Sequence, residues 1–504
     1  MSAAGARDIA AMALRNLSRH KAKTAITAVA VAVSVSLYIF MDGWLLGMNL
    51  DSRRNIVSYE IGAAKVQAAA YFEKKDELPM HESFAGWKPL AESLERAGYA
   101  VAPRFVFSGT LYSRSGSAPL VIDAVDVGLE GRVLRYPSSL EAGRFPAPGR
   151  LELAIGSMAA EKLRVGIPSR PTPEELEELA GAARDAEEEA FVRGLYGPAP
   201  EDEAAAALEA RKLALKPGAS EAELARLWEI LSASGRMDVR ISTVIDQKAE
   251  DGSGRILHVN QLIDASVVGV INSPNPKTNG NVAFMPLDSL QDEAGLMLGG
   301  KVTELLVRRS GASDAELPGR DESAAAVREA LGPALPPGLE VHGWLDYVDD
   351  YIAASRGDQV STRIMILMLF VLSFIGIANT MLMAILERTK ETGMLRALGM
   401  TDGQVVAAYM IEAACIGAMG SLAGIAIGCL INVPMVAHGL DYSAMAEQIG
   451  GDYGYRITAL FRSAWNPPVI VLSGIVATAL SAAAALLPSL RALRMPVTES
   501  LRFE

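Results

Sequence analysis

A glycine-rich segment that ends in a lysine is the first place in this chain where chemistry could be expected. Residues 295–302, GLMLGGKV, match the G-x-x-x-x-G-K start of a phosphate-binding loop, whose backbone amides and lysine hold the phosphates of a nucleotide. The motif ends in Val302, where magnesium binding requires the hydroxyl of serine or threonine. The segment that follows, KVTELLVRRS, has the pattern of a strand, whereas a phosphate-binding loop opens a helix. The sequence therefore predicts no nucleotide site here.

Other reactive side chains are scattered along the chain. The histidines show no metal-ligand spacing, and they stand at His20, His81, His258, His342 and His438. The two cysteines, Cys415 and Cys429, lie in one apolar stretch, where a packing role is expected. The net charge of -12 argues against a nucleic-acid partner, because phosphate binding needs a basic surface. We therefore expect no catalytic residue, metal site or cofactor in this chain.

Four apolar segments are long enough to cross a membrane as helices, because about 20 residues span the hydrocarbon core. They are residues 24–47, 362–386, 405–431 and 468–488. Buried helices of a large soluble protein are the alternative, but charges or prolines bound each segment, which favours membrane spans. The first segment is too long for the core of a signal peptide, and no cleavage site follows it. We therefore expect it to remain as an anchor.

Lysine and arginine predict the orientation of these spans. They gather in residues 1–23, 387–404 and 489–504, which all fall on one side of a four-span chain. The positive-inside rule makes that side the cytoplasm. Both termini are then cytoplasmic, the first as an amphipathic helix and the last as a tail. Residues 48–361 and the 432–467 loop are expected on the outer side.

The outer segment has the composition of a water-exposed α+β domain. Strands are expected at residues 61–70, 101–127 and 151–156, and in a second block, 238–309, at VRISTVI, IDASVVGVI, NVAFMPL and ELLVRRS. SPNPKTNGN, residues 273–281, is dense in turn formers and predicts a turn. The expected fold is a membrane protein with four transmembrane helices in a 1+3 layout. A large extracytoplasmic α+β domain is inserted between the first two.

A helical insertion interrupts this domain at residues 168–236, where alanine and glutamate runs replace the strand pattern. Thr172 and Ser220, each followed by acids, are expected to start helices there. The acidic face should be solvated. The insertion is either a docking arm for a partner or a tolerated surface elaboration, and we favour the second interpretation.

The connection between the second and third spans is the most informative part of the chain. It predicts a short amphipathic helix on the inner membrane face, with Met394, Leu395 and Leu398 at helical spacing among charged residues. Gly399 is expected to stop this helix, and Thr401 to cap the next one. The alternative, a charged loop that merely obeys the positive-inside rule, predicts no particular residue order.

The residue order in this connection resembles that of a known family. ERTKETGMLRALGM resembles the signature between the first two of the three C-terminal spans in MacB/FtsX-type permeases of ABC transporters, which include the LolC/LolE lipoprotein-releasing branch. MALRNLSRHKAKTAIT resembles the family's N-terminal lead, and LLPSLRALRMPVTESLRFE resembles its C-terminal end. IGAAKVQAAAYFE, VAPRFVFSGTL and AIGSMAAEKLRVG resemble its MacB-like periplasmic core domain. The resemblance covers nearly the whole chain apart from the insertion.

This resemblance implies the permease subunit of an ABC transporter in the bacterial inner membrane. Such permeases pair with a second copy or a paralogue and bind two copies of a cytoplasmic ATPase, which holds ATP and magnesium. The cytoplasmic segments of this chain are too short to contain that ATPase. The implied ATPase-coupling residues are Glu387, Arg388, Glu391, Gly393, Leu395, Arg396, Leu398 and Gly399. Their motion would reach the outer domain and drive the extraction or export of lipoprotein, lipid or small molecules, with a periplasmic or outer-membrane partner in some systems.

Two other functions stay open at this point. An FtsX-like subunit would transmit ATPase-driven motion to a cell-wall hydrolase without moving a substrate. A sensor receptor would relay the binding of a ligand by the outer domain. No kinase-like or other output domain is recognisable in the sequence, which argues against the sensor.

Two features of the third span predict how it packs. Gly420, Gly424 and Gly428 form a G-x-x-x-G-x-x-x-G face that suits close helix contacts in a bundle or a dimer, although small residues are also common in an alanine-rich helix. Glu412 lies about two turns into the span, where a carboxylate facing lipid is costly. It is expected to snorkel or to find a partner.

Overall fold

The computed structural model divides the chain into two compact units. The helical unit comprises residues 1–51, 350–441 and 460–504, and the sheet unit comprises residues 52–349 and 442–459. The structure describes residues 21–167, 171, 173–196, 220–248, 256–292, 299–312, 320–441 and 460–494. The N-terminal helix expected within residues 1–23 therefore lies almost entirely outside the described residues, as do residues 442–459 of the 432–467 loop and the end of the C-terminal tail.

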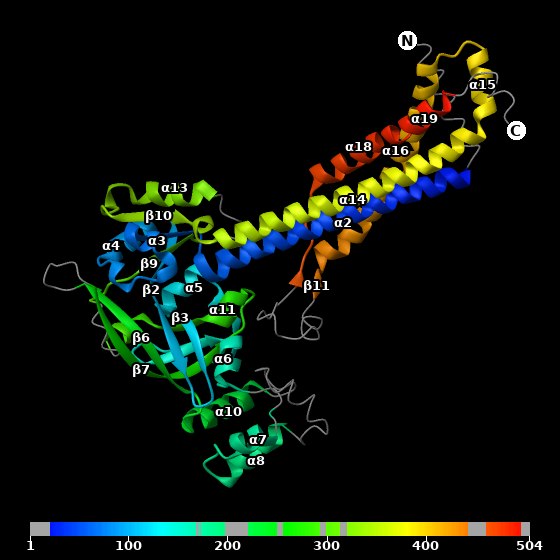
Figure 1. Ribbon diagram of the computed structural model, residues 1–504. Coiled ribbons are helices and arrows are strands. Elements are labelled where there is room, and N and C mark those ends of the chain that lie inside the picture. The colour runs from blue at the N-terminus through cyan, green and yellow to red at the C-terminus, as the bar shows by residue number, and fades with distance from the viewer. Residues whose placement is uncertain are drawn as a thin grey trace. The chain divides into compact units, whose positions relative to one another are not determined.

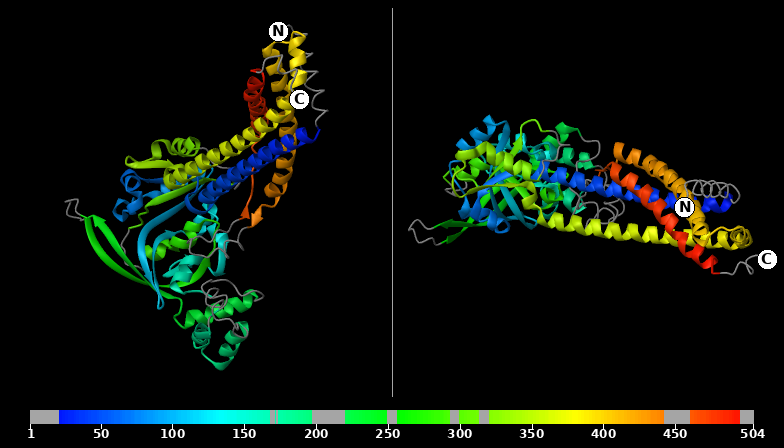
Figure 2. Two further views of the ribbon diagram at one scale, coloured as in Figure 1. Left: turned by 45° about the vertical axis from the view of Figure 1, so that its right-hand side comes forward. Right: turned by 90° about the horizontal axis from the view of Figure 1, so that it is seen from above.

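Long helices make up the helical unit (Figures 1 and 2). Its elements are α2 (Lys21–Ile56), α14 (Asp349–Glu387), α15 (Thr389–Ala397), α16 (Asp402–Ala437), α18 (Pro467–Ala484), α19 (Leu486–Ala492) and the short strands β11 (Leu440–Asp441) and β12 (Leu460–Phe461). Four helices, α2, α14, α16 and α18, are long and apolar enough to cross a membrane. The four spans expected from composition are therefore present as helices.

Three of these helices extend beyond the expected spans. α2 continues to Ile56, α14 begins at Asp349, and α16 continues to Ala437. The change in polarity that marks the edge of the hydrocarbon does not end a helix, because charged residues such as Arg53 and Arg54 still form the backbone hydrogen bonds. Even Pro434 is accommodated near the end of α16. The prediction of a loop over residues 432–467 was wrong for residues 432–437, which belong to α16.

A ten-stranded sheet forms the centre of the sheet unit. Its strands are β1 (Ala64–Ala68), β2 (Tyr99–Tyr112), β3 (Ser117–Val125), β4 (Leu140–Gly143), β5 (Glu152–Gly156), β6 (Asp238–Lys248), β7 (Ile256–Ile271), β8 (Val282–Pro286), β9 (Glu304–Arg309) and β10 (Leu339–Gly343). They are ordered β10-β1-β9-β2-β3-β8-β5-β7-β4, and β6 pairs with β2 and β7. Neighbours are antiparallel except for β3 with β8 and β5 with β7. Figure 2 shows β6 and β7 as a long hairpin.

The central strands of this sheet are covered by apolar side chains on both faces. In β9, Leu305 and Val307 belong to the large core cluster, whereas Leu306 between them belongs to a smaller one on the other face. This two-sided burial explains the nearly continuous apolar runs of the central strands. The helices around the sheet are η1 (Val57–Ile61), α3 (Ala69–Glu73), η2 (Lys75–Glu77), η3 (Met80–Glu82), α4 (Trp87–Arg96), α5 (Val127–Val133), η4 (Tyr136–Ser139), α6 (Ser157–Leu163), α7 (Pro173–Ala180), α8 (Ala186–Tyr196), α10 (Glu221–Ala233), α11 (Pro276–Asn281), α12 (Leu287–Asp292), α13 (Arg320–Leu331), η5 (Gly332–Ala334) and η6 (Trp344–Tyr347).

The described part of the insertion is helical and joins the core. Ser220 starts α10 with a reciprocal capping box to Glu223, as its sequence predicts, whereas Thr172 lies outside the described residues. Trp228 and Leu231 of α10 are buried in the large core cluster. A Cβ placed on Gly143 of β4 would lie 3.0 Å from the Trp228 ring. The acidic face is solvated, but α10 is more than a surface elaboration, because its apolar face completes the core.

The segment after the glycine-rich motif enters the sheet directly, since Val302 bridges Phe84 and β9 begins at Glu304. The strand predicted after the motif is therefore present, where a phosphate-binding loop would open a helix; residues 293–298 lie outside the described residues. The turn expected at 273–281 instead contains α11, because the side chain of Asn275 caps the helix by accepting from the Lys277 amide and Pro276 fits its first turn.

Candidate functional site

The turn between α14 and α16 is built by local capping. Gly399 follows α15 with a φ of +103°, and the Met400 amide donates to the Leu395 carbonyl at 3.0 Å. A glycine in this conformation closes the last turn of a helix at little cost. Thr401 and Gln404 then form a capping box at the start of α16. The helix stop and the new start predicted from Gly399 and Thr401 are therefore confirmed.

A buried ion pair joins the two sides of this turn. Nη1 of Arg388, at the junction of α14 and α15, lies 3.1 Å from both carboxylate oxygens of Glu412 in α16. Both side chains are only 7% exposed. The partner expected for Glu412 is thus present. Removing either member would leave the other as an uncompensated charge in an apolar setting, which is strongly unfavourable.

A second polar contact fixes the orientation of α15. The Thr392 hydroxyl and the Tyr409 hydroxyl of α16 are 2.6 Å apart, and both residues are buried. Leu395 lines a cavity of about 40 Å³ between the same helices, which has room for water but not for a ligand. Gly393 is also buried, on the same side of α15. These contacts attach α15 to α16, so the two helices should move together.

The opposite side of α15 is exposed. Leu398 is 85% exposed and Met394 is 51% exposed, so two of the three apolar residues expected on one face point away from the bundle. Glu387 and Glu391 are exposed as well. Arg396 closes the turn instead, with Nε 3.0 Å from Oδ1 of Asp402.

The predicted coupling residues therefore separate into two groups. Arg388, Gly393, Leu395 and Arg396 hold the turn together, while Glu387, Glu391, Leu398 and Gly399 are exposed, although Glu391 also borders the cavity that Leu395 lines. Thr392 and Tyr409 were missed by the sequence analysis. They are 17 positions apart and lie on different helices, and only the packing of α15 on α16 brings them together.

The glycine face of α16 packs against α2 of the same chain. A Cβ on Gly420 would lie 2.6 Å from the carbonyl oxygen of Ala28, and one on Gly424 would lie 2.6 Å from that of Ala32. A Cβ on Gly428 would approach Ser36 and Ile39 to 3.1 Å. Only glycine permits this backbone approach, so the stripe serves packing within the bundle.

Substituting Gly424 by leucine is expected to destabilise the helical unit by about 1–3 kcal/mol, because α2 must move away from α16. Thermal unfolding of the purified chain in detergent measures this loss. Gly376 in α14 is the matched control, since nothing lies within 4 Å of a Cβ there and Gly376→Leu should change the stability little. Equal effects of the two substitutions, or loss of a dimer without loss of stability in Gly424→Leu, would contradict this packing.

The site is thus a short helix between two apolar helices, with one side held to α16 and the other side exposed. Residues 363–497, which contain α15 and its contacts, match the family model described as FtsX-like permease C-terminal. The chain is also similar to the ABC transporter permease YtrF of Bacillus subtilis, with 29% identity over 27% of this chain and 30% of that protein. It is 22% identical to the lipoprotein-releasing system transmembrane protein LolC of Xylella fastidiosa, over 32% and 40% of the two chains.

A further relative is the macrolide export ATP-binding/permease protein MacB of Nitrobacter winogradskyi, which is 27% identical over 36% of this chain and 28% of that protein. These matches confirm the resemblance to MacB/FtsX-type permeases of ABC transporters. The matched segments span between 28% and 40% of the length of these three relatives.

Proposed function

We propose that this chain is the permease subunit of an ABC transporter whose ATP hydrolysis takes place on a separate cytoplasmic ATPase. The observation that carries the proposal is the geometry of α15 within the region that matches the permease family. Its inner side is fixed to α16 by the Arg388–Glu412 ion pair, and its outer side presents Met394 and Leu398. An exposed apolar pair on a rigidly held helix is suited to binding a protein partner.

The assembly that follows from this proposal contains two permease chains and two ATPase copies. The second permease is another copy or a paralogue, and ATP and magnesium are held by the ATPase. The chain lies in the bacterial inner membrane with both termini in the cytoplasm and the sheet unit outside. The proposed substrates are lipoproteins, lipids or small molecules that are extracted or exported at the outer side. The names of LolC and MacB, which refer to lipoprotein release and macrolide export, support this range.

Replacing Met394 and Leu398 together by serine is expected to weaken binding of the ATPase by about tenfold or more, because central apolar anchors supply most of the energy of an interface. Binding and ATP hydrolysis are measured with the purified permease in nanodiscs and its ATPase. Arg396 is left unchanged, since its ion pair with Asp402 closes the turn.

The control for this experiment is Lys390→Ser, which removes an exposed polar side chain from the same helix. It should change binding little, as exposed charges at an interface rim contribute little affinity. Unchanged ATPase binding by the double variant would contradict the proposed role of α15. Stimulation of a cell-wall hydrolase, with no substrate displaced, would instead favour the FtsX-like function. Ligand binding without any response of an ATPase would favour a sensor.

A further inference from the structure

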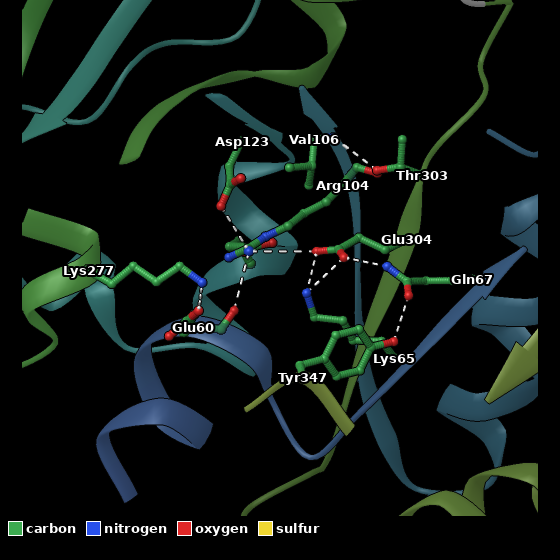
Figure 3. A network of polar contacts seen from close by, with 11 residues as sticks. Glu60, Lys65, Gln67, Arg104, Val106, Asp123, Lys277, Thr303, Glu304 and Tyr347 are labelled. Atoms are coloured by element: carbon green, nitrogen blue, oxygen red, sulfur yellow. Dashed lines mark hydrogen bonds and ion pairs between the residues drawn. The ribbon is translucent and has the colours of Figure 1, made fainter. Parts of the chain in front are cut away.

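A network of buried charges lies inside the sheet unit (Figure 3). Arg104 of β2 is at its centre and is almost completely buried. Its Nη1 lies 3.0 Å from Oδ2 of Asp123 in β3, and its Nε donates to Oε1 of Glu130 in α5 at 2.6 Å. Nη1 is also 3.8 Å from Oε1 of Glu304 in β9. The Arg104 guanidinium therefore connects β2 to the neighbouring strands β3 and β9 and to α5.

One branch of the network reaches η1, the helical turn that directly follows α2. Oε1 of Glu60 lies 2.5 Å from Nζ of Lys277, and Oε2 accepts from Nδ2 of Asn275 at 2.8 Å. The backbone carbonyl of Glu60 accepts from Arg104 Nη1 at 3.4 Å. The Ser58 carbonyl of the same turn accepts from the Arg135 amide at 2.8 Å. The point where the chain leaves α2 is thus held by α11 and by the central arginine.

The other branch reaches η6, the turn that precedes α14. The Tyr347 hydroxyl donates to Oε1 of Gln67 at 2.6 Å, and Nε2 of Gln67 donates to Oε2 of Glu304 at 2.9 Å. Lys65 of β1 lies 2.8 Å from the same carboxylate oxygen and 4.9 Å above the Tyr347 ring. The Trp344 amide also donates to the Ala63 carbonyl at 3.2 Å. The start of α14 is therefore held through the same Glu304 that contacts Arg104.

Stability alone does not account for these buried charges. An apolar core of the same volume is often equally stable or more so, because desolvation offsets the attraction between buried ions. Charged groups with fixed partners do, however, define one geometry, since each broken contact leaves a buried charge uncompensated. Here the fixed geometry relates η1 and η6, the turns that adjoin α2 and α14 in the chain, to strands β1, β2, β3 and β9.

We propose that this network is a coupling joint, which makes the chain segments at the ends of α2 and α14 move together with the central strands. Glu60, Lys277, Gln67 and Tyr347 are its positioning residues, and Arg104 with Glu304 connects the two branches. The inference rests on the proposed function, because it concerns how motion produced by the ATPase reaches the sheet. It identifies the side chains that transmit this motion to the sheet.

The test compares hydrogen exchange of the permease–ATPase complex with and without ATP. The variant combines Tyr347→Phe and Lys277→Met, which remove one hydrogen bond and one ion pair at the two branches while leaving the central arginine intact. Wild-type protein should show an ATP-dependent change in exchange both around α15 and in β1 and β9. In the variant the change around α15 should persist, while that in β1 and β9 should fall by at least about twofold.

Two further proteins separate coupling from loss of fold. Glu152→Gln is the matched control, because it breaks the Arg144–Glu152 pair, 2.6 Å apart in the same unit but outside the network. It should keep the full response of the strands. The single variant Lys277→Arg, with Tyr347 unchanged, keeps the positive charge beside Glu60. Its strands β1 and β9 should respond to ATP as in wild type.

The outcomes distinguish this inference from the proposed function. A variant whose strands respond to ATP as in wild type overturns the joint while the proposed function stands. A weakened response in the Glu152→Gln control as well would show a general loss of fold and would also overturn it. If wild-type protein binds the ATPase but shows no ATP-dependent change in the sheet unit, then the proposed function itself fails.

Discussion

Replacing Arg388 by methionine should destabilise the helical unit by about 3–5 kcal/mol, which is the usual cost of removing one partner of a buried ion pair. Glu412 would remain in α16 with its carboxylate buried and without the guanidinium 3.1 Å away. An uncompensated charge in a membrane span is especially unfavourable, because no water is available to solvate it. Unfolding of the purified chain by SDS or heat, in mixed micelles, measures the loss.

The double variant Arg388→Met with Glu412→Leu tests whether the loss comes from the orphaned charge. Because both charges are removed, we expect most of the stability to return. Arg396→Ala is the matched control in the same turn. Its partner Asp402 is 62% exposed, so the pair should contribute no more than about 1 kcal/mol. If the double variant is as unstable as the single one, packing rather than charge accounts for the effect.

The features that depend on the residue types within a short segment could be predicted from the sequence. The four membrane helices follow from the length of apolar segments, and the capping at Gly399, Thr401 and Ser220 follows from residue types over four or five positions. Glu412 was recognisable as a carboxylate in need of a partner, since its cost in a membrane does not depend on the fold. The local ends of helices were less well predicted, because α2 and α16 continue past the apolar segments.

Features that depend on packing could not be predicted in this way. The glycine stripe was consistent with close contacts in a dimer or a bundle, or with simple small-residue content, and only the position of α2 shows that the backbone at Ala28 and Ala32 approaches it. The charge network was not recognisable, because Lys65, Arg104 and Glu304 come from strands that are far apart along the chain, and Lys65 and Arg104 are each the only charged residue of their strand. Strand register decides that these three side chains meet.

Glu130→Gln is expected to alter how the stability of the chain depends on pH. Burial raises the pKa of the Glu130 carboxyl to about 7, and the nearby carboxylates Asp123 and Glu304 act in the same direction, against the opposing effect of Arg104. In the native state this carboxyl therefore keeps its proton at pH values where an unfolded chain, with a pKa near 4.5, has lost it. The protonated form also balances the network, which otherwise has one more carboxylate than it has cations: Glu60, Asp123, Glu130 and Glu304 against Lys65, Arg104 and Lys277.

The sign of the effect follows from the raised pKa. The stabilisation is complete below about pH 4.5 and is lost as the pH rises through about 7, at a cost of about 3 kcal/mol. Glutamine resembles the protonated carboxyl but does not titrate. The free energy of unfolding of wild type, minus that of Glu130→Gln, should therefore fall by about this amount between about pH 5 and about pH 8. Thermal unfolding of the full chain in detergent across this range provides the measurement.

Asp123→Asn shows which carboxyl holds the proton. Burial raises the pKa of Asp123 too, and its carboxylate contacts the same Arg104 guanidinium at 3.0 Å. If Glu130→Gln leaves the pH dependence of wild type unchanged while Asp123→Asn removes it, then the proton belongs to Asp123 and the assignment to Glu130 is wrong. If either substitution removes it, the two carboxyls share one proton through Arg104. The charge of the network would then be a property of the cluster as a whole.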